Sequence, residues 1–210
     1  MQLLNTNASN TKIMKTQTGT EYEIASLSLM PDGILCPSQI IAGCKEPCLV
    51  SSGRGQMHSV AKARQSKSDL WHNDQAQFLA LLKKEMGAFI RRCEKRGKLA
   101  AFRLNTISDI PWEKHGIPQM FPTALLYQKQ VRAAFKTDAP ITVVFRGGFP
   151  DRYLGRPVID GDKSDLVNLY AGPVVIGLKL KGGKAIQAST SPFIVDNPAA
   201  ALPAYAIAAE

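Results

Sequence analysis

Three of the four cysteines lie within thirteen residues, and this cluster constrains the chain more than any other feature. Cys36, Cys44 and Cys48 stand in the segment CPSQIIAGCKEPC, whose prolines and glycine are typical of a loop. A loop that curls around one centre can present three thiolates from one side, and thiolates are ligands for iron-sulfur clusters and zinc. The segment therefore predicts a metal centre held by a loop.

The spacing of the three cysteines does not choose the metal, but the lack of a second ligand pair favours an iron-sulfur cluster over zinc. Structural zinc sites usually combine two close pairs of ligands, whereas this chain has no second cysteine pair. His58, His72 and His115 also lack the spacing of a zinc finger. Zinc stays open as the weaker interpretation, as do cysteines that only pack or take part in redox exchange. Three cysteines leave one iron with a ligand other than cysteine, and an open iron is available for chemistry.

The flanking sequence predicts a βαβ unit. Residues 21–29 form a first strand, which ends at the breaker Met-Pro-Asp-Gly, and the cysteine loop follows. Helical spacing predicts a helix over 56–71 and a second one after a cap at Asn73 or Asp74 that ends at Gly97. An apolar stretch over 99–105 predicts the returning strand. We expect an α/β fold, either a partial barrel or an open, mostly parallel sheet with helices, with the cysteine loop at the carboxyl end of the first strand.

The fourth cysteine is expected far from the other three. Cys93 belongs to the apolar stripe of the second helix, some nineteen residues from its start. At 1.5 Å per residue this is about 28 Å from the end where the helix begins. Cys93 is therefore expected to be a small core residue and not the fourth ligand.

Polar residues follow the second strand and are expected to face the cysteine loop. Asn105, Thr106, Ser108 and Asp109 are therefore candidate ligand contacts, although such residues also bond their own backbone in ordinary turns. Arg54, in the glycine turn before a helix, suits a carboxylate, a phosphate or the charge of a cluster. A flexible turn that simply starts a helix is the commoner interpretation for this motif.

The remaining segments carry weaker signals. Residues 1–20 read as a flexible arm, 21–196 as a single α/β cluster-binding domain and 197–210 as a tail rich in alanine and proline. A helix is predicted over 123–135, and strands over 141–145 and 174–180. The acidic run 160–165 reads as a solvated turn, and Lys179 and Lys181 as a solvated basic strand face.

Charge and hydropathy bound the partners. The net charge of +9 favours polyanions such as nucleic acid, although a charge of this size also serves solubility alone. No stretch has the roughly 18 apolar residues of a membrane span, and the first residues lack the apolar run of a signal peptide. We therefore expect a protein of the reducing cytosol, without a membrane partner.

The order of the motifs resembles a bacteriophage family, gene product 88. The resemblance covers about residues 27–185. It comprises the cysteine segment, Gly53-Arg54-Gly55, Ala63-Arg64, the helix with Phe78, the run from Arg103-Leu104-Asn105 through Ser108-Asp109-Ile110 to Trp112-Glu113, Val158-Ile159-Asp160-Gly161-Asp162, and Gly177-Leu178-Lys179.

This family looks like a shortened relative of the radical SAM enzymes, in which three cysteines hold a [4Fe-4S] cluster at the top of a partial α/β barrel. The resemblance implies Cys36, Cys44 and Cys48 as the cluster ligands, with Arg54, Asn105, Ser108 and Asp109 around the open iron. It implies a phage protein that works in the cytoplasm of the infected cell, with redox or radical chemistry and S-adenosylmethionine as a candidate cofactor. The alternative is a basic nucleic-acid-binding phage protein in which the cluster, or zinc, only staples the loop.

Overall fold

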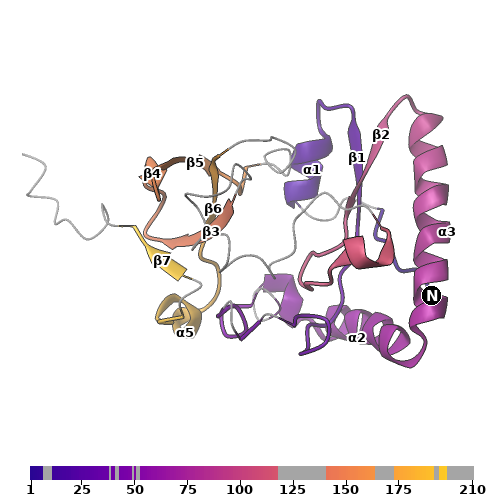
Figure 1. Cartoon of the computed structure of the whole chain (residues 1–210), viewed down its shortest axis with the longest axis horizontal. Helices are drawn as coiled ribbons and strands as arrows, with labels where there is room; N and C mark the ends of the chain where they lie inside the picture. Colours follow the sequence, from indigo (N-terminus) through magenta and orange to yellow (C-terminus); the bar gives the residue numbers. More distant parts are fainter. Residues whose placement is uncertain are drawn as a thin grey trace, which may run out of the picture.

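A parallel βαβ unit forms one half of the molecule, on the right of Figure 1. In this computed structural model, which describes residues 1–6, 11–37, 39–40, 43–48, 50, 53–117, 141–163, 173–191 and 194–197, strands β1 (Tyr22–Ser26) and β2 (Leu99–Arg103) pair in parallel. Their register runs from Tyr22 opposite Leu99 to Ser26 opposite Arg103. Helices α2 (His58–Asn73) and α3 (Gln75–Glu94) make the crossover between them. The βαβ prediction is confirmed.

The amphipathic pattern of α3 accounts for its packing on β2. The stripe predicted from the sequence is buried at Phe78, Leu82, Met86, Phe89 and Cys93. The Asp74 carboxylate caps the helix by accepting the N–H of Gln77 at 2.8 Å. After the helix ends at Glu94, Gly97 adopts a left-handed conformation with φ of 62° and turns the chain into β2.

An aromatic cluster joins both helices to the short 3₁₀ helix η3 (Trp112–His115). Trp71 of α2 meets Phe78 edge to face at 5.2 Å between ring centroids and Trp112 at 5.6 Å. Trp112 is completely buried. This cluster places the segment after β2 against the helices, so that the turn 104–111 is held at the carboxyl end of the strands.

The first residues pack against this unit, unlike the loose arm that their composition predicts. Leu3 and Leu4 are fully buried in the core of the βαβ unit. Their N–H groups donate to the two carboxylate oxygens of Glu85, at 2.9 and 2.7 Å. Asn5 pairs with Ser26 at the edge of β1, and α1 (Thr11–Gln17) lies beside the same strand. The partner of Asn5 lies more than twenty residues further along the chain, and that of Leu3 more than eighty. Local composition therefore does not reveal these contacts.

Substituting Leu4 with Ala is expected to lower the free energy of unfolding by about 2–4 kcal/mol, because a buried side chain is removed from a packed core. The control is Met14→Ala, at a side chain that is 50% exposed in α1, with an expected change below about 0.5 kcal/mol. Urea unfolding followed by tryptophan fluorescence measures both. A Leu4 variant that unfolds at the same urea concentration as the wild type contradicts the packed N-terminus.

A curled five-stranded sheet forms the other half of the molecule (Figure 1). The strand order is β4 (Arg152–Tyr153), β5 (Arg156–Asp160), β6 (Val175–Lys179), β3 (Ile141–Arg146) and β7 (Ile194–Asp196). All neighbouring pairs are parallel except the hairpin of β4 and β5. The sheet curls into a half-barrel and is separate from the two-stranded sheet of β1 and β2. This confirms the α/β fold and, of the two alternatives that the sequence left open, the structure has the partial barrel.

The two sheets have separate cores. That of the half-barrel centres on Ile141, Val143, Phe145 and Val175. A short helix, α5 (Lys184–Gln187), follows β6. The helix predicted over 123–135 and residues 198–210 of the predicted tail lie outside the described residues. In the part of the chain that the structure describes, no helix is long and apolar enough to cross a membrane.

Candidate metal centre

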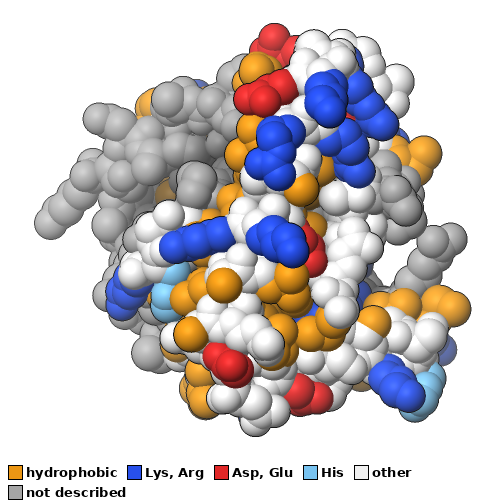
Figure 2. Space-filling view, turned by 90° about the vertical axis from the view of Figure 1, so that its right-hand side faces the viewer, with side chains coloured by type: hydrophobic (Ala, Val, Ile, Leu, Met, Phe, Trp, Pro, Cys, Tyr) orange, Lys and Arg blue, Asp and Glu red, His pale blue; other side chains and the backbone are white. Residues whose placement is uncertain are grey.

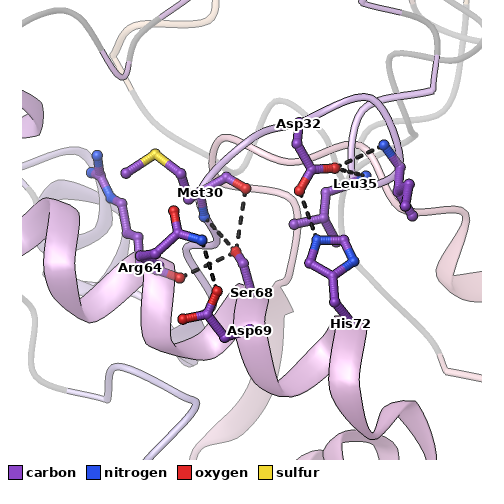
Figure 3. A network of polar contacts seen from close by, with 9 residues as sticks. Met30, Asp32, Leu35, Arg64, Ser68, Asp69 and His72 are labelled. Atoms are coloured by element: carbon purple, nitrogen blue, oxygen red, sulfur yellow. Dashed lines mark hydrogen bonds and ion pairs between the residues drawn. The ribbon is translucent and has the colours of Figure 1, made fainter.

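The chain leaving β1 is fixed by one face of α2 before it reaches Cys36 (Figure 3). Ser68, which is fully buried, accepts the N–H of Met30 at 2.8 Å. One turn further along α2, His72 Nε2 lies 2.7 Å from Asp32 Oδ2. The other oxygen of Asp32 accepts the N–H groups of Ile34 and Leu35, at 2.7 and 2.9 Å. The backbone carbonyl of Asp32 accepts the N–H of Cys36 at 2.8 Å, so this turn places the first cysteine.

The three clustered cysteines line one cavity of about 540 Å³. Cys36 is buried, and its Sγ–H donates to the carbonyl of Ile107 at 3.7 Å. Cys44 and Cys48 are half-buried. The carbonyl of Gln39 holds the loop by accepting the N–H groups of Cys44 and Lys45, at 3.1 and 3.2 Å. All three cysteines of the loop thus line the same cavity.

The environment of the Cys36 and Cys44 thiols opposes their ionisation when no cation is bound. Burial raises the pKa of Cys36 to about 12, and the negative charges of Asp109 and of the other two cysteines add to this effect. Burial, with the charges of Asp109 and Cys48, likewise raises the pKa of Cys44 to about 11. The three sulfur atoms and the Asp109 carboxylate therefore form one electrostatically coupled group. A bound metal reverses this preference, because its positive charge stabilises thiolates.

The two halves of the molecule meet at this cavity. One wall is the cysteine loop and the turn 105–109 that follows β2. The opposite wall comes from the half-barrel and includes Val144 of β3 and residues 178–181 at the end of β6. Two bonds tie the cysteine loop to the half-barrel: Ser189 Oγ donates to Glu46 Oε2 at 2.9 Å, and Ser191 Oγ donates to the carbonyl of Gly43.

Charged side chains of both signs line the cavity. Lys179 lies over the ring of Phe149, with 5.5 Å from Nζ to the centroid, and Lys181 pairs with Asp162 at 2.6 Å. Arg103 and Lys45 complete the cationic side, and Asp109 and Asp162 supply the carboxylates. The sequence analysis assigned Lys179, at the end of β6, and Lys181, just after it, to a solvated face, because no local pattern shows that this strand end faces the cysteines.

The turn after β2 lies beside the cysteine loop and lines the same cavity. Asn105, Thr106, Ser108 and Asp109 all line the cavity. Asp109 is buried, and its N–H donates to the carbonyl of Leu35 at 2.8 Å, which ties the turn to the residue before Cys36.

Within this turn, the polar atoms of Asn105 are used internally. Its Oδ1 accepts from Ser108, Ile110 and Trp112, and its Nδ2 donates to Ile110. Asn105 therefore builds the turn, and Asp109 is the member whose charge acts on the thiols.

Two further residues that the sequence analysis considered, Arg54 and Cys93, are not among the residues that line this cavity. Arg54 belongs to the 3₁₀ helix η2 (Gly53–Gln56), just before α2, and its side chain is outside the described part of the chain. Cys93 is fully buried in the core of the βαβ unit, 3.9 Å from a carboxylate oxygen of Glu23. Because Glu23 is near the start of β1 and the cysteine loop follows the end of that strand, Cys93 lies at the opposite end of the unit.

No three or more His, Cys, Asp and Glu side chains among the described residues form a group that can hold a single metal ion. A four-iron cluster makes a different demand, because each thiolate binds a separate iron. The three cysteines of such a site are spaced around one side of the cluster, which is much larger than a single metal ion.

Replacing Asp32 with Asn is expected to destabilise the folded protein by about 1 kcal/mol at pH 7, because charge-assisted hydrogen bonds become neutral ones. Burial raises the pKa of Asp32, but hydrogen bonds from Leu35, His72 and Ile34 outweigh it, so the net pKa lies below its ordinary value of 3.8. A lowered pKa stabilises the fold above 3.8, and this contribution is lost as the pH falls through the lowered value.

Urea unfolding of Asp32→Asn between pH 7 and pH 2 tests this expectation. The difference from the wild type should shrink toward zero at the acidic end. Asp69→Asn, an exposed position of the same helix α2, is the control and should show a much smaller effect. A difference that stays constant over this pH range contradicts the assigned role of the Asp32 carboxylate.

The structure defines an α/β protein in which a loop of three cysteines, at the carboxyl end of a βαβ unit, faces a half-barrel sheet across a cavity. A family model described as Gene product 88 matches residues 2–141, which is more than half of the chain. The chain therefore belongs to the gene product 88 family of bacteriophage proteins. The match includes the βαβ unit and all three clustered cysteines and ends where β3 begins. Comparisons with curated proteins and with solved structures give no match.

Proposed function

We propose that the protein binds one [4Fe-4S] cluster through Cys36, Cys44 and Cys48. The observation that carries this proposal is the placement of three thiols from one loop on the wall of a single cavity. All three cysteines lie in the segment that matches the family. Thiolates are the usual protein ligands of such clusters, and a loop at the carboxyl end of parallel strands is a common place for a cofactor.

The cavity also suits a small ligand beside the cluster. A volume of about 540 Å³ falls within the range of small-molecule sites, and its lining mixes apolar side chains with a few charged ones. Three cysteines leave one iron of a four-iron cluster without a cysteine ligand, and that iron can bind a substrate or cofactor. S-adenosylmethionine is the candidate that the family resemblance suggests. Electron transfer and radical chemistry are the two uses we propose for the centre, in the reducing cytoplasm of the infected cell.

Anaerobic purification followed by visible spectroscopy and by iron, sulfide and zinc analysis tests the proposal. We expect brown protein with about four irons and four sulfides per chain and a broad absorbance near 400 nm. Colourless protein that carries stoichiometric zinc supports a zinc-stapled loop. Protein without metal after anaerobic reconstitution overturns the cluster proposal.

A basic surface supports a second candidate function, binding of nucleic acid. Lysine and arginine side chains gather along the α3 side of the molecule, toward the top of Figure 2. Arg91, Lys95 and Arg96 are exposed at the carboxyl end of this helix. Beside them, Arg92, Arg96 and Lys98 border a pocket of about 350 Å³. The helix dipole also favours cations at the carboxyl end of a helix, and this is an alternative reason for the basic residues there. Binding of nucleic acid therefore needs a direct test.

We expect the wild type to bind DNA at low salt, with an affinity that falls steeply as salt rises. The double variant Arg91→Glu and Lys95→Glu should weaken binding about tenfold or more without changing the iron content. Fluorescence anisotropy with single- and double-stranded oligonucleotides measures both proteins. Absence of binding at low salt removes this second candidate.

A further inference from the structure

A second pocket, at the other end of the βαβ unit from the cysteine loop, is lined by cations that the proposed metal centre does not use. Its volume is about 350 Å³. It lies where the end of α3 and the turn after it meet the start of β1 and the end of α1 (Figure 1), and Thr6 of the N-terminal segment completes its wall. Because segments far apart in the chain converge here, the pocket is a product of the fold and not of one helix end.

The lining of this pocket is strongly positive. Arg92, Arg96 and Lys98 face a single carboxylate among the described residues, that of Glu23, so the lining has a net charge of +2. The helix dipole favours cations in the last turn of α3, but Lys98 lies beyond the end of that helix. Its Nζ donates to the carbonyl of Thr20 at 2.6 Å, and this neutral acceptor leaves the charge of the lysine uncompensated.

Glu23 compensates one of the three cations. Its two carboxylate oxygens lie 3.3 and 3.4 Å from Nη1 of Arg96. This contact occupies one of the three guanidinium nitrogen atoms, and the Arg96 side chain is 59% exposed. Arg96 is therefore anchored beside the pocket and keeps donors for a ligand.

Arg92 is held at the pocket without an anionic partner. Its Cζ lies 4.9 Å from the centroid of the Phe89 ring, which fixes the guanidinium in place. Its Nη1 donates to Thr6 Oγ1 at 3.5 Å, a long hydrogen bond, and its Nε is buried without a hydrogen-bond partner among the described residues. In that part of the chain no carboxylate forms an ion pair with Arg92. A half-buried guanidinium in this situation favours an anion that enters the pocket.

We propose that this pocket binds a phosphate monoester, either the terminal phosphate of a nucleic-acid strand or that of a free nucleotide. A phosphate monoester carries a charge of about −1.5 to −2 at pH 7 and three strong acceptor oxygens, which match a lining of two arginines, a lysine and one carboxylate. A carboxylate or a backbone phosphodiester has a single charge and compensates only half of the surplus. The site is independent of the metal centre and goes beyond the second candidate function, which needs only contacts to a nucleic-acid backbone.

Calorimetric titration of the full chain with inorganic phosphate, thymidine 5′-monophosphate and thymidine tests for the site. We expect the two phosphates to bind and thymidine not to bind. Arg92→Gln and Lys98→Gln should each weaken binding of the monophosphate about tenfold, because each removes a charge-assisted contact. Lys83→Gln removes an exposed charge of α3 that does not line the pocket, and it should leave the affinity unchanged.

Two single-stranded oligonucleotides of one sequence, with and without a 5′-phosphate, distinguish the two sources of the phosphate. Tighter binding of the phosphorylated strand, reduced in Lys98→Gln, identifies a strand end. Binding of the monophosphate without such a preference identifies a free nucleotide. Either result supports the phosphate site.

The inference is overturned if the wild type binds neither inorganic phosphate nor the monophosphate and does not distinguish the two strands. Equal binding of both strands would then support the second candidate function alone. Unchanged affinity in both pocket variants also overturns the inference. If circular dichroism shows that Arg92→Gln does not fold, Lys98→Gln decides. A wild type without iron overturns the proposed metal centre and leaves this test unaffected.

Discussion

Substituting Cys36, Cys44 or Cys48 singly with Ser is expected to abolish the chromophore of the proposed iron-sulfur cluster, whereas Cys93→Ala is expected to retain it. The first three residues line one cavity, and each acts electrostatically on at least one of the others. Serine is a poor ligand for iron in such a cluster, since the oxygen lacks the soft character of a thiolate. Removing one of three ligands leaves two, which is too few to retain the cluster through purification.

The control is informative because Cys93 is the fourth cysteine and is completely buried. Its sulfur lies beside Glu23, near the opposite end of the βαβ unit from the cysteine loop. Cys93→Ala removes one sulfur atom from the core and should cost about 1 kcal/mol of stability with no loss of iron. Iron and sulfide per chain, measured after identical anaerobic reconstitution, give the comparison. Equal loss of iron in the Cys44 and Cys93 variants would show that all four cysteines serve the same centre.

The sequence predicts the βαβ unit well because its signals are local. The apolar stripe from Phe78 to Cys93 has helical period, Asp74 is a typical cap, and both strands are short apolar runs. Parallel strands joined by a helical crossover then bring the cysteine loop and the turn after β2 to the same edge. For this reason the positions of Asn105, Ser108 and Asp109 on the wall of the cavity follow from topology alone.

The rest depends on pairings between distant residues. The buried positions of Leu3 and Leu4 depend on Glu85, and the anchoring of the cysteine loop depends on Ser189 and Ser191. Lys179 belongs to a strand in which apolar and polar residues alternate. This pattern predicts a polar face but does not indicate which residues that face contacts. Such contacts arise when two independently formed sheets pack together, and no local pattern encodes their relative placement.

Arg64 shows the same limit at a single residue. The sequence analysis predicts a helix over 56–71 that includes Arg64 but does not indicate what its side chain meets. The burial of its Nε and Nη1 atoms without a hydrogen-bond partner among the described residues emerges only in the folded protein. The environment of this guanidinium is therefore a property of the assembled structure.

Replacing Asn105 with Ala is expected to lower the free energy of unfolding by about 3–5 kcal/mol, because one side chain closes the whole turn after β2. Its Oδ1 accepts the N–H of Ile110 at 3.1 Å and the indole N–H of Trp112 at 2.9 Å. Its Nδ2 donates to the carbonyl of Ile110 at 2.9 Å. The truncation leaves these groups unsatisfied beside the fully buried ring of Trp112.

The matched control is Thr106→Ala, one residue further along the same turn. The Thr106 hydroxyl makes one long bond, 3.4 Å to the carbonyl of Arg103, so its loss should cost less than about 1 kcal/mol. Urea unfolding followed by tryptophan fluorescence measures both variants. If Asn105 served only as a ligand contact, Asn105→Ala would unfold at the wild-type urea concentration and change ligand binding alone. A large destabilisation instead assigns Asn105 to the frame that holds Asp109 against the thiols, which leaves Asp109 as the residue of this turn that acts on the centre.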